Sequence, residues 1–159
     1  MPLGRKHTLT NKQWLDTVAN IKTIISAIEL KKYEDAAIAD IVAKAKNKKV
    51  AYAYSGGKDS IVLASLCQKA GIADCLMGIS NLEFAPFMDW VDRHKPAGLE
   101  IINTGQDMAW LAKNQDIIFP DATGLAKWCR EIHLKAQTQY FKKHNLDMLI
   151  LGRRRATWS

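Results

Sequence analysis

Cysteine is scarce in this chain, and its copies are widely spaced. Cys67, Cys75 and Cys129 form no C-x-x-C pair and leave one thiol over. A disulfide framework uses an even set of cysteines and a zinc ribbon uses close pairs, so neither is supported. The four histidines also lack H-E-x-x-H or other metal-ligand spacing. We therefore expect reduced, mostly buried thiols and no bound metal.

Long apolar runs and acidic residues are also in short supply. No stretch reaches the roughly 18 uncharged apolar residues of a membrane span, and no apolar region follows Arg5 and Lys6 as in a secretion signal. A cytoplasmic protein without membrane contact is the expectation. The 23 Lys and Arg residues exceed the 16 Asp and Glu residues. The resulting net charge of +7 favours a negatively charged partner, such as a polyphosphate or a nucleic acid.

What the chain does contain is enough apolar sequence for one globular domain, since 48% of its 159 residues are hydrophobic. The first third predicts helices. Thr10 and Gln13 have the spacing of a capping box. Apolar residues then recur at steps of four and three, at Trp14, Val18, Ile21, Ile25 and Ile28. A second amphipathic helix is expected from about Glu34 to Lys46. Lysines crowd its end, which we interpret as a solvated helix terminus. We assign residues 1–48 to a helical segment packed on the core.

From residue 49 the pattern changes to short apolar runs separated by amphipathic stretches, which is typical of parallel strands covered by helices on both faces. The expected strands are Val50 to Tyr54, Asp74 to Ile79, Leu99 to Asn103 and Met148 to Leu151. The expected helices are Lys58 to Ala70, closed by Gly71, then Phe84 to His94, Gly105 to Asn114 and Gly124 to His144. Residues 49–159 are thus predicted to form a three-layer α/β/α domain with a mostly parallel sheet.

A glycine-rich turn follows the first expected strand. It consists of Ser55, Gly56, Gly57, Lys58, Asp59 and Ser60. Ligands of open α/β sheets bind beyond the carboxyl ends of the strands, and the N-terminus of a helix attracts anions. The two glycines permit close approach of a ligand to the backbone, while the serines and the lysine add donors and positive charge. We predict that this turn binds a phosphate or pyrophosphate.

The turn does not match two common phosphate-binding motifs. A Walker A loop would have glycine at Tyr52 and Ser or Thr at Asp59, and the dinucleotide fingerprint would have glycine at Lys58. The six residues instead resemble SGGxDS, the pyrophosphate loop of the adenine nucleotide alpha hydrolase superfamily. That superfamily contains the ATP pyrophosphatases and the sulfonucleotide reductases.

Further segments resemble the phosphoadenosine phosphosulfate (PAPS) reductase family. These are Trp128-Cys129 with Lys135, Gly152-Arg153-Arg154-Arg155, and Leu82-Glu83-Phe84. The resemblance implies an adenine nucleotide ligand, ATP or PAPS, with its phosphates on Ser55 to Ser60 and with Mg²⁺ if the ligand is ATP. It implies a second anion clamp at Gly152, Arg153, Arg154 and Arg155. It implies supporting roles for Glu83 and Lys135. Ala156 and Trp158 replace the family's Glu and Ser, and from its place beside the arginines we expect Trp158 to stack on adenine.

The chain departs from this family at an acidic residue expected at the nucleotide site and at the segment that carries out reduction. Ile79-Ser80-Asn81 stands where the family has D-T-G, and the sequence ends at Ser159 without the reductases' E-C-G-x-H segment. The paired cysteines of a related iron–sulfur cluster are missing, so no cluster is expected. We therefore assign no catalytic residue. Reduction would need a thiol from a missing C-terminal segment or from a thioredoxin-like protein.

Three functions stay open on these grounds. The first is a PAPS-reductase-like protein that binds an adenine nucleotide or sulfonucleotide, with possible reduction by an external thiol. The second is an ATP pyrophosphatase that adenylates a substrate in sulfur transfer to tRNA or DNA. The third is a basic nucleic-acid-binding or regulatory module with a vestigial nucleotide site. The oligomeric state is not predicted.

Overall fold

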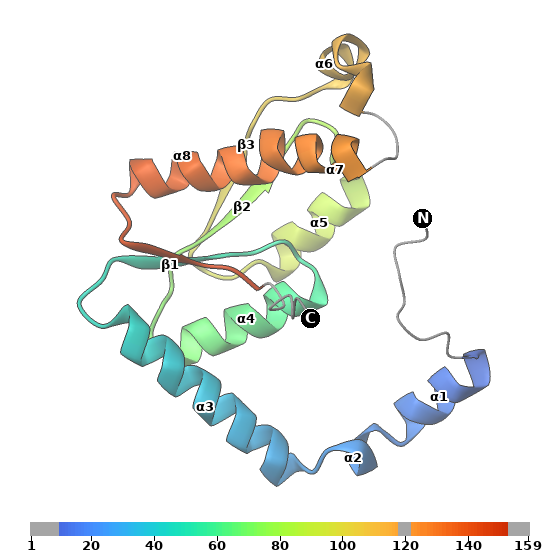
Figure 1. Cartoon of the computed structure of the whole chain (residues 1–159), viewed down its shortest axis with the longest axis vertical. Coiled ribbons are helices and arrows are strands. Elements are labelled where there is room, and N and C mark those ends of the chain that lie inside the picture. Colours follow the sequence, from blue (N-terminus) through green and yellow to red (C-terminus); the bar gives the residue numbers. More distant parts are fainter. Residues whose placement is uncertain (1–9, 118–121, 153–159) are drawn as a thin grey trace. The chain divides into compact units, whose positions relative to one another are not determined.

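The computed structural model describes residues 10–117 and 122–152, which belong to two compact units, Met1–Ala37 and Ile38–Ser159. The first unit contains helices α1 (Asn11–Ala19) and α2 (Ile21–Ile24) and the start of α3 (Ala27–Ala45), which continues into the second unit (Figure 1). The predicted packing of residues 1–48 on the sheet stays a prediction.

The first unit confirms the predicted capping box but corrects the expected helices. The Gln13 N–H donates to the Thr10 hydroxyl at 3.3 Å, and the Thr10 N–H donates to the Gln13 side chain at 2.9 Å. The apolar stripe predicted one helix to Ile28, yet the chain is extended at Ile25. The Ser26 hydroxyl accepts the N–H of the residue three positions on, at 3.1 Å, so a new helix begins there and not near Glu34.

The second unit is built on a parallel sheet. Its strands in the described residues are β1 (Val50–Ala53), β2 (Cys75–Ile79), β3 (Leu99–Asn103) and β4 (Met148–Ile150), in the order β3-β2-β1-β4. Tyr52 pairs with Cys75 on one side of β1 and with Ile150 on the other. The predicted α/β class and all four predicted strands are confirmed.

Helices cover both faces of this sheet (Figure 1). Side chains alternate along β1, so Tyr52 faces α4 (Lys58–Lys69) and α5 (Ala85–His94), while Ala51 faces α8 (Lys135–Lys143). Buried residues of the first face are Val50, Tyr52, Tyr54, Leu63, Ala64, Cys67, Ile72, Cys75, Met77, Ile79 and Val91. Ala136 and Tyr140 of α8 pack with Ala51 on the second face. The arrangement is compatible with a three-layer α/β/α fold.

The remaining helices refine two predictions. Helix α6 (Met108–Lys113) begins later than the expected Gly105, because Gly105 has a φ of +86° and Asp107 caps the helix by accepting the Trp110 N–H at 2.7 Å. A short 3-10 helix, η1 (Gln115–Ile117), follows. The expected helix from Gly124 to His144 is present as three consecutive helical segments: α7 (Ala122–Cys129), a π-helical turn η2 (Arg130–Leu134), and α8.

Candidate functional site

The glycine-rich turn connects β1 to α4, as predicted, and is held in shape by Ser60. The buried Ser60 hydroxyl donates to the Gly57 carbonyl at 2.8 Å. It accepts the Ser55 N–H at 3.1 Å and the Ser55 hydroxyl at 3.2 Å. Its hydrogen bonds therefore close the turn on itself, and the exposed Ser55 is the serine that faces outward.

The two glycines of the turn have different environments. Gly56 has a φ of +72°, a left-handed conformation that favours glycine. A Cβ at Gly56 would lie 3.0 Å from the Phe87 ring and 3.2 Å from the Trp90 ring on α5. Gly57 is exposed and immediately precedes α4. Gly56 thus lets the turn pack on α5, and Gly57 leaves the first N–H groups of α4 open to a ligand.

Lys58 and Asp59 begin α4 and lie on the surface. Their side chains form an ion pair at 2.8 Å and are 80% and 62% exposed. A surface pair of this kind contributes little to folding stability, about 0–1 kcal/mol. Lys58 is therefore able to turn toward an anion at the helix N-terminus at low cost.

The turn forms one wall of a cavity of about 400 Å³ at the carboxyl ends of the strands. Ser55, Gly57, Lys58, Asp59 and Ser60 line this cavity, whereas Gly56 packs behind the turn. Gly152, which follows β4, also lines it. A Cβ on Gly152 would lie 3.5 Å from the Asp59 carbonyl oxygen, so these two segments are in close contact. The structure therefore brings most of the predicted phosphate loop together with the first residue of the predicted second clamp.

Other predicted site residues lie elsewhere. Glu83 accepts the Ser80 N–H at 3.0 Å and the Ser80 hydroxyl at 3.2 Å, which ties the turn after β2, and it does not line the cavity. Lys135 is exposed at the first residue of α8 and does not line the cavity either. The predicted clamp residues Arg153, Arg154 and Arg155, and the predicted adenine-stacking Trp158, lie outside the described residues.

The opposite wall of the cavity consists of residues that were not predicted from the sequence to lie together. Cys129, His133 and Gln137 line it, and they follow one another at intervals of four across α7, η2 and α8. Residues four apart share one face of a helix. A single π-helical turn inside an α-helix is frequent at functional sites. The interval of four is visible in the sequence, but it points to a site only once the cavity beside these residues is known.

This wall is held close to the sheet by two contacts. Gly78 of β2 lies so near α8 that a Cβ there would be 2.6 Å from the Ala136 Cβ and 3.4 Å from the Ile132 carbonyl oxygen. Gln106, only 2% exposed, donates from its side chain to the Glu131 carbonyl of η2 at 3.4 Å. Gly78 and Gln106 therefore fix the π-helical turn that presents Cys129 and His133.

The three thiols differ in accessibility. Cys67 and Cys75 are fully buried, and burial raises the pKa of Cys67 to about 11 and also raises the pKa of Cys75. Cys129 is half-buried and reaches the cavity. Two of the three thiols therefore lie in the core, as predicted. The third, Cys129, faces the candidate site.

No protein-family model and no curated protein matches this sequence. Across the described ranges 10–117 and 122–152, no helix is long and apolar enough to cross a membrane. The same ranges contain no group of three His, Cys, Asp or Glu side chains placed to hold a metal ion.

Proposed function

We propose that this chain is a PAPS-reductase-like protein that binds an adenine nucleotide or sulfonucleotide, with an adenine nucleotide alpha hydrolase-like fold. The phosphates would lie on Ser55, Gly57 and Lys58 at the N-terminus of α4. The predicted clamp residues Arg153, Arg154 and Arg155 would add positive charge for the same ligand.

The observation that carries this proposal is the position of the cavity in the sheet. From β1 the chain adds β2 and β3 on one side, and β4 then pairs on the other side of β1. The strand order therefore reverses between β1 and β4. Open α/β sheets bind ligands beyond the carboxyl ends of the strands at such a reversal. The cavity is lined by Tyr54 and Ser55 after β1 and by Leu151 and Gly152 after β4.

The chemistry of the lining supports a phosphate ligand. The N-terminus of a 12-residue helix supplies N–H donors and a partial positive charge, and Lys58 adds a full one. If the ligand is ATP, the Asp59 carboxylate would help to hold Mg²⁺ on its phosphates, since Mg²⁺ prefers oxygen ligands, and the ion would offset the charge of the phosphates. Reduction of a sulfonucleotide to sulfite and the free nucleotide takes two electrons, which two thiols of another protein would supply as they are oxidised to a disulfide.

Isothermal calorimetry on the full chain tests the proposal. The ligands are ATP, adenosine phosphosulfate, PAPS and the 3′,5′-bisphosphate product, each with and without Mg²⁺. Preference for a sulfonucleotide supports the reductase-like function, and Mg²⁺-dependent binding of ATP alone supports the ATP pyrophosphatase instead. Failure of every ligand to bind would show the proposal to be wrong.

Two variants locate the ligand on the turn. Lys58→Ala removes a charge-assisted contact worth about 1.5–3 kcal/mol, so we expect the affinity to fall by a factor of about 10 to 150. Lys113→Ala removes an exposed lysine from α6, outside the cavity, and serves as the matched control. Equal affinities in the two variants would place the ligand somewhere else.

A further inference from the structure

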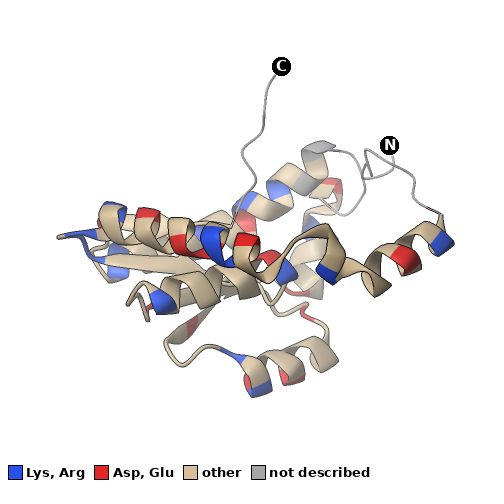
Figure 2. Cartoon of the chain, turned by 90° about the horizontal axis from the view of Figure 1, so that it is seen from below, with Lys and Arg blue, Asp and Glu red and all other residues tan. Residues whose placement is uncertain are grey.

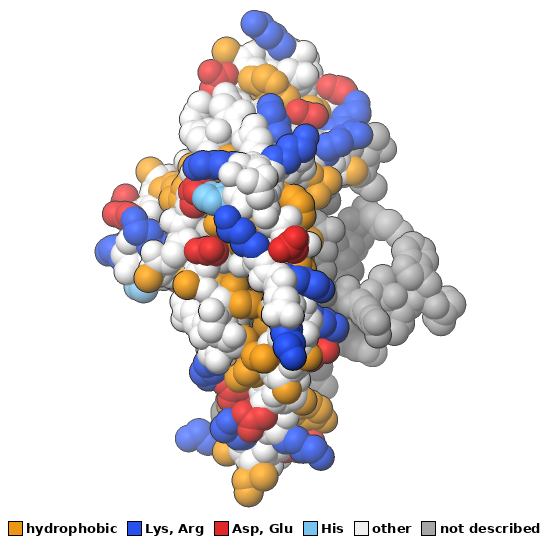
Figure 3. All heavy atoms as spheres, turned by 90° about the vertical axis from the view of Figure 1, so that its left-hand side faces the viewer, with side chains coloured by type: hydrophobic (Ala, Val, Ile, Leu, Met, Phe, Trp, Pro, Cys, Tyr) orange, Lys and Arg blue, Asp and Glu red, His pale blue; other side chains and the backbone are white. Residues whose placement is uncertain are grey.

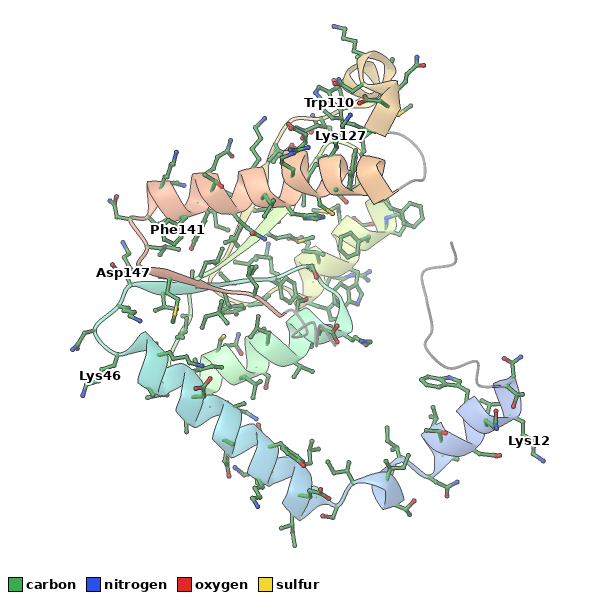
Figure 4. All side chains as sticks on the ribbon, in the orientation of Figure 1. Lys12, Lys46, Trp110, Lys127, Phe141 and Asp147 are labelled. Carbon is green, nitrogen blue, oxygen red and sulfur yellow. The ribbon has the colours of Figure 1, made fainter. Side chains whose placement is uncertain are left out.

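A second concentration of positive charge lies at the opposite end of the strands from the cavity. The segment 46–49 precedes β1, and the segment 142–147 precedes β4. The Asp147 N–H donates to the Lys49 carbonyl at 2.9 Å, and the Lys49 N–H donates to the Asp147 carboxylate at 2.7 Å. Figure 4 shows Lys46 and Asp147 at this end. The two segments thus form one continuous surface.

Five lysines occupy this surface, which we call the lysine face: Lys46, Lys48, Lys49, Lys142 and Lys143. All five are exposed. Among the described residues, only Lys143 of this set forms an ion pair, with Glu100 at 2.7 Å. The neighbouring carboxylates are Asp74, Glu100 and Asp147, so the face keeps an excess of two positive charges. Figure 3 shows basic side chains, with acidic ones among them, on this side of the molecule.

Stabilisation of a helix end accounts for Lys142 and Lys143, which lie in the last turn of α8, but not for the other three lysines of this face. Lys44 lies in the last turn of α3, where a cation favours the helix dipole, and it pairs with Asp40 at 2.6 Å. Lys46, Lys48 and Lys49 lie beyond the last residue of α3, in the loop that Asn47 turns with a φ of 58°. Elsewhere basic and acidic residues are interspersed along the helices (Figure 2). The unpaired lysines of the loop are thus free to bind an external anion.

Two lysines of the lysine face border a groove. Lys46 and Lys48 stand in the wall of a groove of about 430 Å³, which Asp74 and apolar residues also line. Lysine is a flexible point charge, and phosphate contacts of this type position a nucleic acid without reading its bases. We propose that the lysine face binds the phosphate backbone of a nucleic acid. This binding is independent of the proposed nucleotide site, because the two lie at opposite ends of the strands.

The number of lysine–phosphate contacts predicts how steeply the affinity for nucleic acid falls with salt concentration. Each phosphate neutralised on a duplex contributes about −0.9 to the slope of log K against log salt. The four unpaired lysines therefore predict a slope of about −3.6, or a loss of about 150-fold in affinity between 50 and 200 mM salt. The triple variant Lys46→Gln, Lys48→Gln and Lys49→Gln should flatten the slope by about 2.7.

Fluorescence anisotropy of the full chain with labelled duplex DNA, duplex RNA and single-stranded RNA provides the test. The control variant carries Lys12→Gln, Lys22→Gln and Lys32→Gln, which change the net charge equally in the first unit. We expect the control and Lys58→Ala to bind nucleic acid as the unmodified chain does, and the lysine-face triple variant to retain its circular dichroism spectrum. Absence of binding, an equal effect of both triple variants, or binding only to vesicles of anionic phospholipid would overturn the proposal.

Discussion

A methyl group added at Gly78 tests how the cavity wall is held against the sheet. Carbon atoms in contact are normally about 3.5–4.0 Å apart, and the added Cβ would lie 2.6 Å from the Ala136 Cβ. Neither group can rotate away, so α8 would have to retreat by about 1 Å. Overpacking of this kind typically costs about 1–3 kcal/mol. We expect Gly78→Ala to lower the urea midpoint of unfolding by about 1 M.

Removing the opposing methyl provides the matched control. Ala136→Gly alone should cost about 1 kcal/mol from helix propensity, plus the loss of a buried methyl. In the Gly78→Ala background the same change relieves the overlap, so the two substitutions should couple by about 1–2 kcal/mol in a double-mutant cycle. Urea unfolding followed by circular dichroism measures all four chains. An unchanged midpoint in Gly78→Ala, or equal costs of Ala136→Gly in both backgrounds, would refute the close contact between β2 and α8.

Three further outcomes follow from individual side chains. Iodoacetamide should alkylate Cys129 in the folded chain, whereas Cys67 and Cys75 should react only after unfolding. Peptide mass spectrometry measures the rate at each cysteine, and equal rates at all three would contradict this expectation. The hydrogen bond from Lys143 holds the pKa of Glu100 below its usual value, so Glu100→Gln should destabilise the chain at pH 7. In urea titrations that difference should begin to shrink as the pH falls through the unfolded-state pKa of about 4.3, and it should vanish only below the lower pKa of the folded state, where the carboxylate is protonated in both states. Ser26→Ala should lower the stability of the first turn of α3 by about 1 kcal/mol and speed hydrogen exchange of the Glu29 amide about fivefold. Ser26→Asp keeps a side-chain acceptor and should have neither effect.

The fold was predictable where local sequence decides structure. The four strands are short apolar runs that cannot satisfy a helical period, and Gly71 closes α4 with a φ of +82° as expected. The break before α3 was missed because apolar residues keep a helical period across it. Ser26, followed three residues later by Glu29, carried the opposite signal, and the side-chain cap prevails over the periodicity.

One wall of the candidate site could be predicted from the sequence, and the opposing wall could not. The turn from Ser55 to Ser60 is contiguous, so its glycines and donors are visible in the sequence itself. The opposing wall depends on contacts between distant segments, since Gly78 and Gln106 decide where η2 lies. The spacing of Cys129 and His133 becomes informative only once the cavity beside them is known.

The pairing of β1 with β4 also governs when the proposed pocket comes into existence during synthesis. β1 carries the glycine-rich turn, yet its second hydrogen-bonded neighbour is formed by Met148–Ile150, almost a hundred residues later in the chain. Until those residues leave the ribosome, one side of β1 presents unpaired N–H and C=O groups, a template for pairing with another chain. A nascent or prematurely released chain would therefore be prone to aggregation and could not form the proposed pocket. Pairing of β4 with β1 would cover the exposed strand edge and complete the pocket at the same time.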